Sequence, residues 1–220
     1  EWVAPVSATL TVTNGGSDVI SALNQFISAN GTSIVFGLPG NSATVTLYGV
    51  PSSSLIAGDL HQVSVLATDA TATATRGAFS WFKDLANKSV ALGPVLSVPT
   101  VTSAFATVLR PRTQGTFQPE YQTGIGVSYA QSGTNRTVTV SASKGYFGNA
   151  ATTFDLDTPD LTSASGFQAM WGLSQGFATA YSITATNATS NVSVDGSQYL
   201  IAGRSGSVPP AAIRASTSRR

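Results

Sequence analysis

Apolar and polar residues alternate one by one along much of the chain. The clearest alternating stretches are 8–13, 44–48, 62–67, 126–129, 136–141 and 181–186. A period of two places the apolar residues on one face of a β-strand. Thr and Val fill many of these positions, and their branched side chains favour the extended backbone. The pattern predicts an all-β protein built from antiparallel sheets packed as a sandwich, either Ig-like or jelly-roll-like.

The same alternation predicts the core. The residues expected to face inward are Leu10, Val12, Val45, Leu47, Val63, Val65, Val138, Val140 and Ile183. Two segments fit short helices. The first follows a cap at Ser17 or Asp18 and has apolar residues at helical spacing up to Ile27, although two short strands fit it as well. The second is 162–171. We therefore expect at most one or two short helices.

Glycine and proline indicate how the chain divides. Gly93-Pro94 and Pro99 stiffen a short stretch and interrupt strand pairing. This predicts an N-terminal sandwich domain over 1–93, a connector over 94–99, a C-terminal sandwich domain over 100–205 and an extended tail over 206–220. One larger sandwich is the alternative.

The strand pattern of 136–141 and 181–186 resembles the immunoglobulin-like sandwiches of bacterial surface proteins. The resemblance implies a fold only. It consists of strand pattern alone, so it assigns no functional residue to this chain.

Charge is scarce throughout the 220 residues. Charged residues make up 10% of the chain, against about 25% in an average soluble protein. Polarity comes instead from 29 Ser and 28 Thr, and the net charge is +1. A balance this close to neutral gives no basis for binding nucleic acid. A hydroxyl-rich, weakly charged surface is typical of secreted, cell-surface or periplasmic β-proteins.

Two further absences in the sequence narrow the class. There is no cysteine, so disulfides, thiolate metal sites and cysteine nucleophiles are excluded. The chain has no apolar run long enough to span a membrane. It begins at Glu1 rather than Met, which leads us to expect processing or trimming.

Nothing in the sequence predicts an enzyme. His61 is the only histidine, and no nucleophile-elbow motif accompanies it. We expect it to be a partly exposed strand residue whose replacement by Ala costs little stability. We predict no catalytic residue and no cofactor-binding residue.

Three aspartates lie close together in Phe154-Asp155-Leu156-Asp157-Thr158-Pro159-Asp160. Asp155, Asp157 and Asp160 offer the oxygen ligands that Ca²⁺ prefers, but the segment lacks the Gly and the distal Glu of an EF-hand loop. The alternative is that they cap a turn or a helical stretch. Ca²⁺ is the one cofactor that the sequence suggests.

Aromatic residues beside glycine-rich turns are candidates for glycan binding. Tyr146 and Phe147 precede Gly148, and Trp171 precedes Gly172. An exposed ring can stack on a sugar face, although such rings more often belong to the core of a sandwich.

Five Asn-x-Ser/Thr sequons are candidate glycosylation sites if the host modifies them. They are Asn30, Asn87, Asn135, Asn187 and Asn191.

These observations predict a non-enzymatic, extracytoplasmic structural or assembly subunit, such as a component of a filament, lattice or envelope complex. Its expected partners are copies of itself or other envelope proteins, joined through β-strands and through the terminal segments 1–6 and 207–220. The alternative is a carbohydrate- or matrix-binding β-sandwich module that uses exposed aromatics.

Overall fold

The computed structural model describes residues 4–37, 42–187 and 198–211. Within these ranges the chain forms fourteen strands and three 3₁₀ turns, and it has no α-helix. The strands are β1 (Val6–Thr13), β2 (Val19–Ile27), β3 (Ser33–Gly37), β4 (Thr44–Gly49), β5 (Leu60–Thr68), β6 (Ala74–Phe82), β7 (Lys88–Ala91), β8 (Thr100–Phe105), β9 (Leu109–Thr116), β10 (Gly124–Gln131), β11 (Arg136–Ser143), β12 (Thr153–Asp157), β13 (Ala180–Thr186) and β14 (Gln198–Ser207). The 3₁₀ turns are η1 (Ser52–Ser54), η2 (Lys144–Phe147) and η3 (Ala169–Trp171).

The chain forms two compact units that alternate along the sequence. The first unit comprises 1–96, 120–123 and 185–203, and the second comprises 97–119, 124–184 and 204–220. The junction at Leu96 lies inside the predicted connector 94–99. The units differ from the predicted contiguous domains because 185–203 belongs to the first unit, so that β14 contributes residues to both.

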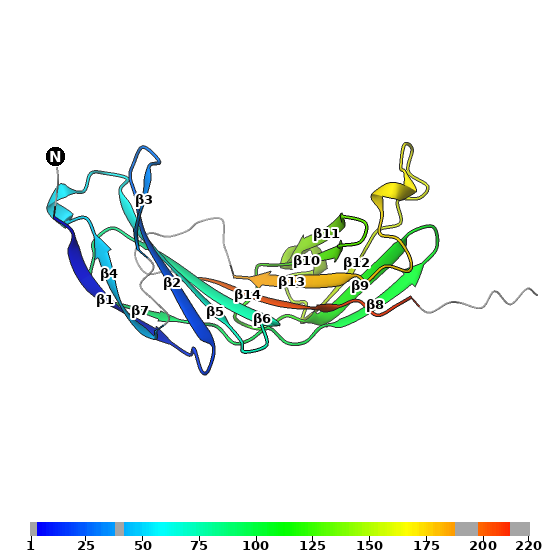
Figure 1. Ribbon diagram of the computed structural model, residues 1–220, viewed down its shortest axis with the longest axis horizontal. Coiled ribbons are helices and arrows are strands. Elements are labelled where there is room, and N and C mark those ends of the chain that lie inside the picture. The colour runs from blue at the N-terminus through cyan, green and yellow to red at the C-terminus, as the bar shows by residue number, and fades with distance from the viewer. Residues whose placement is uncertain (1–3, 38–41, 188–197, 212–220) are drawn as a thin grey trace, which may run out of the picture. The chain divides into compact units, whose positions relative to one another are not determined.

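The first unit is a sandwich of two sheets (Figure 1). One sheet has the order β4-β1-β7, and the other consists of the strands β14-β6-β5-β2-β3 of an eight-stranded sheet. β1 pairs antiparallel with β4 and parallel with β7, and the pairs β2–β3, β2–β5 and β5–β6 are antiparallel. A cluster of buried aliphatic and aromatic side chains from both sheets fills the space between them, and Leu10, Leu47 and Val65 within it have no exposed surface.

The second unit also has two sheets. One consists of the strands β11-β10-β13-β14 of the eight-stranded sheet, and the other has the order β12-β9-β8. Inward-facing residues of β10, such as Val127 and Tyr129, are fully buried. The Tyr129 hydroxyl and the Thr113 hydroxyl of β9 lie 2.6 Å apart and form a buried hydrogen bond that links the two sheets. These features confirm the predicted all-β, predominantly antiparallel sandwich fold.

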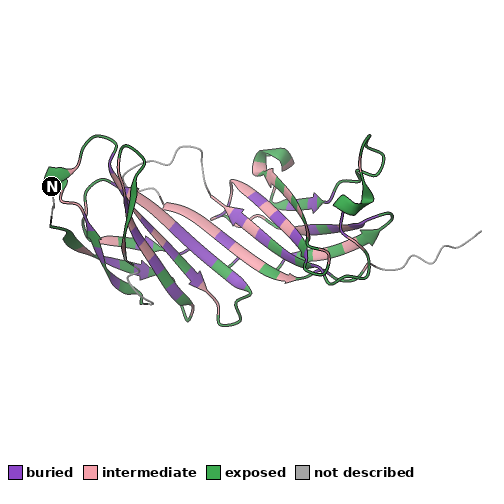
Figure 2. Ribbon diagram, turned by 45° about the horizontal axis from the view of Figure 1, so that its top comes forward, coloured by how far each residue is buried: buried purple, intermediate pink, exposed green. Residues whose placement is uncertain are grey.

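Burial follows the predicted alternation along most strands (Figure 2). Seven of the nine predicted core residues are buried. Val138 and Val140 are the exceptions: both are only half-buried, because a cavity lies over their face of β11.

The segment up to Ile27 forms the single strand β2, neither the helix nor the two short strands that fit the sequence equally well. Val19 and Ile20 show why the sequence is ambiguous. Val19 lies on the outer face and Ile20 on the inner face. Apolar residues therefore occupy both faces of the strand, and the sequence does not alternate between apolar and polar residues there. In 162–171 the only regular element is η3. No described helix is long and apolar enough to cross a membrane.

Candidate functional site

His61 is a core residue, which corrects the expectation of a partly exposed strand position. Its side chain has no exposed surface. The Nε2 atom accepts the backbone N–H of Val50 at 3.0 Å, and Nδ1 donates to the Lys83 carbonyl at 2.7 Å. Burial lowers the pKa of His61, so the imidazole is held neutral, with one nitrogen donating and the other accepting. Both nitrogens are engaged by the backbone, which suits a structural role.

The three candidate calcium ligands are paired with arginines. Arg112 Nε donates to Asp155 at 2.8 Å, and Arg110 contacts Asp157 at 3.4 Å and Asp160 at 3.2 Å. Hydrogen bonds from Arg112 lower the pKa of Asp155, and those from Thr162 lower the pKa of Asp160. All three carboxylates therefore form ion pairs, and Asp160 also caps the turn after β12 by accepting the Thr162 N–H at 3.1 Å. In the part of the chain that the structure describes, no group of three or more His, Asp or Glu side chains is placed to hold a metal ion.

The sequons differ in what their side chains contact. Asn30 and Asn135 are exposed, and Asn135 lies in the β10–β11 turn with φ of 50°. The Oδ1 atom of Asn87 accepts the Thr9 N–H at 2.9 Å, and that of Asn187 accepts the Leu200 N–H at 2.6 Å. Asn191 lies outside the described residues.

The three glycan-binding candidates belong to two separate ring clusters. Phe147 packs edge-on against Phe117 and Tyr146. Tyr146 is 77% exposed. Trp171 is 59% exposed and packs edge-on against Phe167, with ring centroids 6.2 Å apart. Only Trp171 lines a cavity of substantial size.

A second set of aromatics lies on the outer face of the β14-β6-β5-β2-β3 sheet in the first unit, and sequence reasoning missed it. Trp81 and Phe79 are two residues apart on β6 and stack at 6.4 Å, and Phe79 contacts Tyr199 of β14 at 5.3 Å. All three are half-buried. Gln62, which pairs with Trp81 across the sheet, hydrogen-bonds Gln25 on β2. The rings and amides together form an uncharged platform. The sequence signal for this platform is the two-residue spacing of Phe79 and Trp81, which places both rings on one face of a strand.

Strand β3 ends this sheet and carries exposed aliphatic side chains. It pairs with β2 through Phe26↔Ile34 and Ile27↔Ser33, and it is the last strand in the order. Ile34 is 51% exposed and Val35 is 54% exposed. Natural edge strands are usually protected by charged residues or proline. The residues Ser33–Gly37 include neither, whereas the terminal strand β12 of the second unit carries Asp155 and Asp157.

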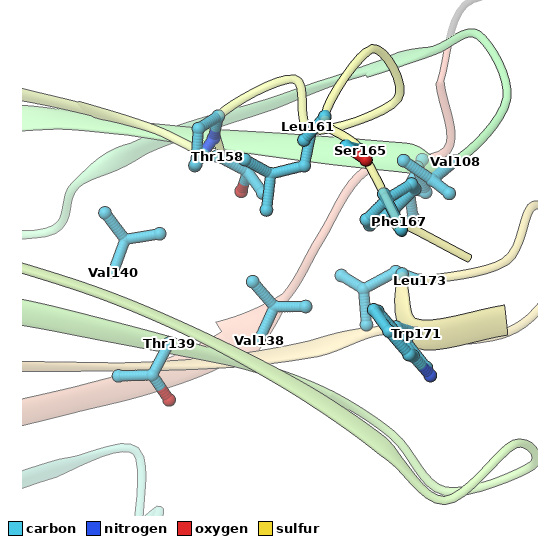
Figure 3. Close-up of a pocket in the computed structure, with 15 residues that line it drawn as sticks. Val108, Val138, Thr139, Val140, Thr158, Leu161, Ser165, Phe167, Trp171 and Leu173 are labelled. Carbon is cyan, nitrogen blue, oxygen red and sulfur yellow. The ribbon is translucent and has the colours of Figure 1, made fainter. Parts of the chain in front are cut away.

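An apolar cavity of about 580 Å³ lies in the second unit, between β11 and the segment 158–173 that follows β12 (Figure 3). Val138 and Val140 of β11 point into it, and Thr139 between them points away. Apolar side chains form the remaining wall: Val108, Leu109, Leu161, Ala164, Phe167, Trp171 and Leu173. None of the lining residues is charged.

Hydrogen bonds hold the segment 158–173 at both ends. At its start, Arg110 Nε donates to the Thr158 carbonyl at 3.0 Å. At its end, Arg136 Nη1 donates to the Gly172 carbonyl at 2.8 Å, and the Leu109 N–H donates to the Leu173 carbonyl at 2.8 Å. The cavity is therefore bounded by elements that are fixed to the second unit's own strands.

No protein-family model and no curated protein sequence matches the chain. Among solved structures, the chain is similar to a two fibronectin type-III domain segment from chicken tenascin, with 16% identity, coverage of 86% of this chain and 83% of that one, and a TM-score of 0.29. It is also similar to BcpA, the major pilin subunit of Bacillus cereus, with 12% identity, coverage of 94% and 69%, and a TM-score of 0.27. A third similarity is to the FN1-FN3 domains of chicken CNTN1, with 11% identity, coverage of 83% and 60%, and a TM-score of 0.24. Identities and TM-scores this low assign neither a family nor a function, and the β-sandwich architecture rests on the sheet topology described above.

Proposed function

We propose that the protein is a non-enzymatic, extracytoplasmic structural or assembly subunit whose copies join edge to edge through strand β3. The observation that carries the proposal is the exposure of Ile34 and Val35 on an edge strand without charge or proline. The free edge of such a strand can pair with the strand of another chain through main-chain hydrogen bonds, and exposed aliphatic side chains add apolar contact. The low charge and the hydroxyl-rich composition support an extracytoplasmic location.

Charge substitution on β3 tests the proposal. We expect the wild-type protein to form assemblies whose mass, measured by light scattering, grows with concentration. Ile34→Lys and Val35→Lys should reduce this mass to that of a monomer, because two approaching edges would each bring a desolvated ammonium group into the contact. The matched control is Ile56→Lys, since Ile56 is 64% exposed in the same unit but lies between η1 and β5.

A monomeric wild type at every concentration, or lysine variants that assemble like the Ile56→Lys control, would contradict edge assembly through β3. The predicted joints at the termini are tested by deleting 1–6 and 207–220 separately. Of these segments, 1–3 and 212–220 lie outside the described residues.

The alternative function, a carbohydrate- or matrix-binding module, is favoured by the aromatic platform of the first unit. The rings of Trp81 and Phe79 lie within 21° of parallel, which suits stacking against the faces of successive sugar rings, and Gln62 supplies amide groups for hydroxyls. This function predicts a monomer retained on an insoluble polysaccharide, with retention lost in Trp81→Ala. Tyr146→Ala and Trp171→Ala test the two sites that the sequence predicted.

A further inference from the structure

The cavity in the second unit is lined almost entirely by hydrocarbon. The Thr158 hydroxyl is buried and donates to the Pro111 carbonyl at 2.8 Å, so it is already paired. Thr139 faces away from the cavity (Figure 3). Among the lining residues, this leaves the Ser165 hydroxyl and the indole N–H of Trp171 as polar side-chain groups available to a ligand.

Contact between this apolar wall and water is energetically unfavourable. Hydration of apolar surface is unfavourable in proportion to its area. Leu161 is 48% exposed and Trp171 is 59% exposed, and Val138 and Val140 face the cavity from a strand whose pattern would otherwise place them in the core. A ligand that covers these side chains would complete the apolar packing of this sandwich.

The cavity cannot easily close on itself. The segment 158–173 is held at both ends by the hydrogen bonds of Arg110 and Arg136. A methyl group at Gly172 would lie 2.6 Å from Val108 Cγ1, so the end of the segment is also packed tightly against the chain at β9. A site that is already formed before binding does not need to be ordered by its ligand.

We propose that this cavity binds a neutral, predominantly apolar small molecule. Its volume, about 580 Å³, falls within the range of about 300–1,000 Å³ that is typical of small-molecule sites. A charged group on the ligand would meet no countercharge among the lining residues and would lose its hydration without compensation. The rings of Phe167 and Trp171 supply aromatic contacts at one end, and Ser165 can bond a single hydroxyl or carbonyl. This binding is independent of assembly through β3.

Fluorescence titration with N-phenyl-1-naphthylamine, a neutral apolar probe, tests the proposal on the full chain. We expect saturable binding of one probe per chain. Val138→Phe and Val140→Phe fill the cavity, and each should weaken binding at least tenfold. The matched control is Ser141→Phe, which adds a larger group to the outward face of the same strand at a residue that does not line the cavity, and it should leave the affinity unchanged.

A second variant keeps the test valid if a filled cavity impairs folding. Leu161→Asp places a carboxylate on the wall at a position that is already half exposed. It should keep the melting temperature close to that of the wild type and abolish probe binding. Displacement of the probe by a neutral and by a charged competitor tests whether the ligand is neutral. Dodecan-1-ol should displace the probe at a lower concentration than dodecanoate at pH 8.

Three results would overturn the proposal. The first is no saturable binding by the wild type. The second is binding that survives both Val138→Phe and Leu161→Asp in folded protein. The third is equal or better displacement by dodecanoate, which would show that the cavity accepts a charged ligand.

Discussion

The imidazole of His61 stacks on the ring of Phe82 with centroids 5.6 Å apart and planes inclined by 16°. The Phe26 ring also packs against this imidazole, with ring centroids 5.4 Å apart. Replacing His61 by Ala removes this packing and leaves the Val50 N–H and the Lys83 carbonyl without their partner. We expect His61→Ala to lower the free energy of unfolding by about 3 kcal/mol, similar to other buried large-to-small changes. Urea unfolding measures it, and a loss within error of zero would restore the view that His61 is dispensable.

His61 also predicts how stability depends on pH. Burial lowers the pKa of His61 in the folded protein below its ordinary value of 6.5, so the unfolded chain takes up a proton more readily. The contribution of the neutral imidazole is therefore fully present above pH 6.5 and is lost as pH falls below it towards the folded-state pKa. The melting temperature, recorded from pH 8 to pH 5, should decrease as the pH falls below 6.5. The slope should be smaller in His61→Phe, which cannot titrate.

The alternation along β5 predicts an inward-facing His61, against the expectation of partial exposure. Residues 61, 63 and 65 share one face of β5, and Val63 and Val65 were expected in the core. Extending the period of two by one position places His61 on the buried face. The sequence does not reveal its partners, because Val50 and Lys83 meet it through backbone atoms, which carry no sequence signal.

For Val138 and Val140, the sequence predicts the direction of the side chains but not their burial. The alternation correctly gives the direction in which they point, but burial depends on what stands across from them. That is the segment 158–173, which has no strand or helix period and whose course depends on hydrogen bonds to Arg110 and Arg136. The cavity therefore could not be predicted from the sequence. The platform around Trp81 was missed because Tyr199 reaches it from a strand far along the chain.

Calcium should not stabilise the wild-type protein. Asp155, Asp157 and Asp160 are paired with Arg110 and Arg112, and a cation would have to displace guanidinium groups to reach them. We expect the same melting temperature in millimolar Ca²⁺, in Mg²⁺ at equal ionic strength and in EDTA. A rise with Ca²⁺ but not Mg²⁺ would instead support the calcium site that the sequence suggested.

The sequons should tolerate substitution to different degrees. Asn187 is half-buried and its Oδ1 accepts the Leu200 N–H at 2.6 Å, so Asn187→Ala should cost about 1 kcal/mol. Asn135→Gly should be neutral or slightly stabilising, because glycine adopts the positive φ of this turn without strain. In a glycosylating host, peptide mass spectrometry should detect glycan at Asn135 in preference to Asn187. The reverse order would contradict this view of the two sites.

Arg76 is a buried cation in the first unit, and we expect its replacement to be strongly destabilising. Its guanidinium contacts Asp18 at 2.6 Å and donates to the carbonyls of Asn14, Gly15 and Gly93 at 2.9–3.0 Å. It thereby fixes the β1–β2 turn and the chain after β7 to one point. Arg76→Met leaves a largely buried carboxylate and the carbonyls of Asn14 and Gly93 without the Arg76 donor, while the Gly15 carbonyl keeps the Asp18 N–H. The loss should be about 3–5 kcal/mol.

The matched control for Arg76 is Arg112→Met. Arg112 also pairs with an aspartate, but both side chains of that pair are 41–48% exposed, so the loss should be much smaller. Arg76→Lys should fall between the two, because an ammonium group cannot reproduce the planar fork that contacts the carboxylate and the carbonyls together. Urea unfolding of the three variants gives the comparison. Equal losses for Arg76→Met and Arg112→Met would show that burial does not set the strength of the Arg76 network.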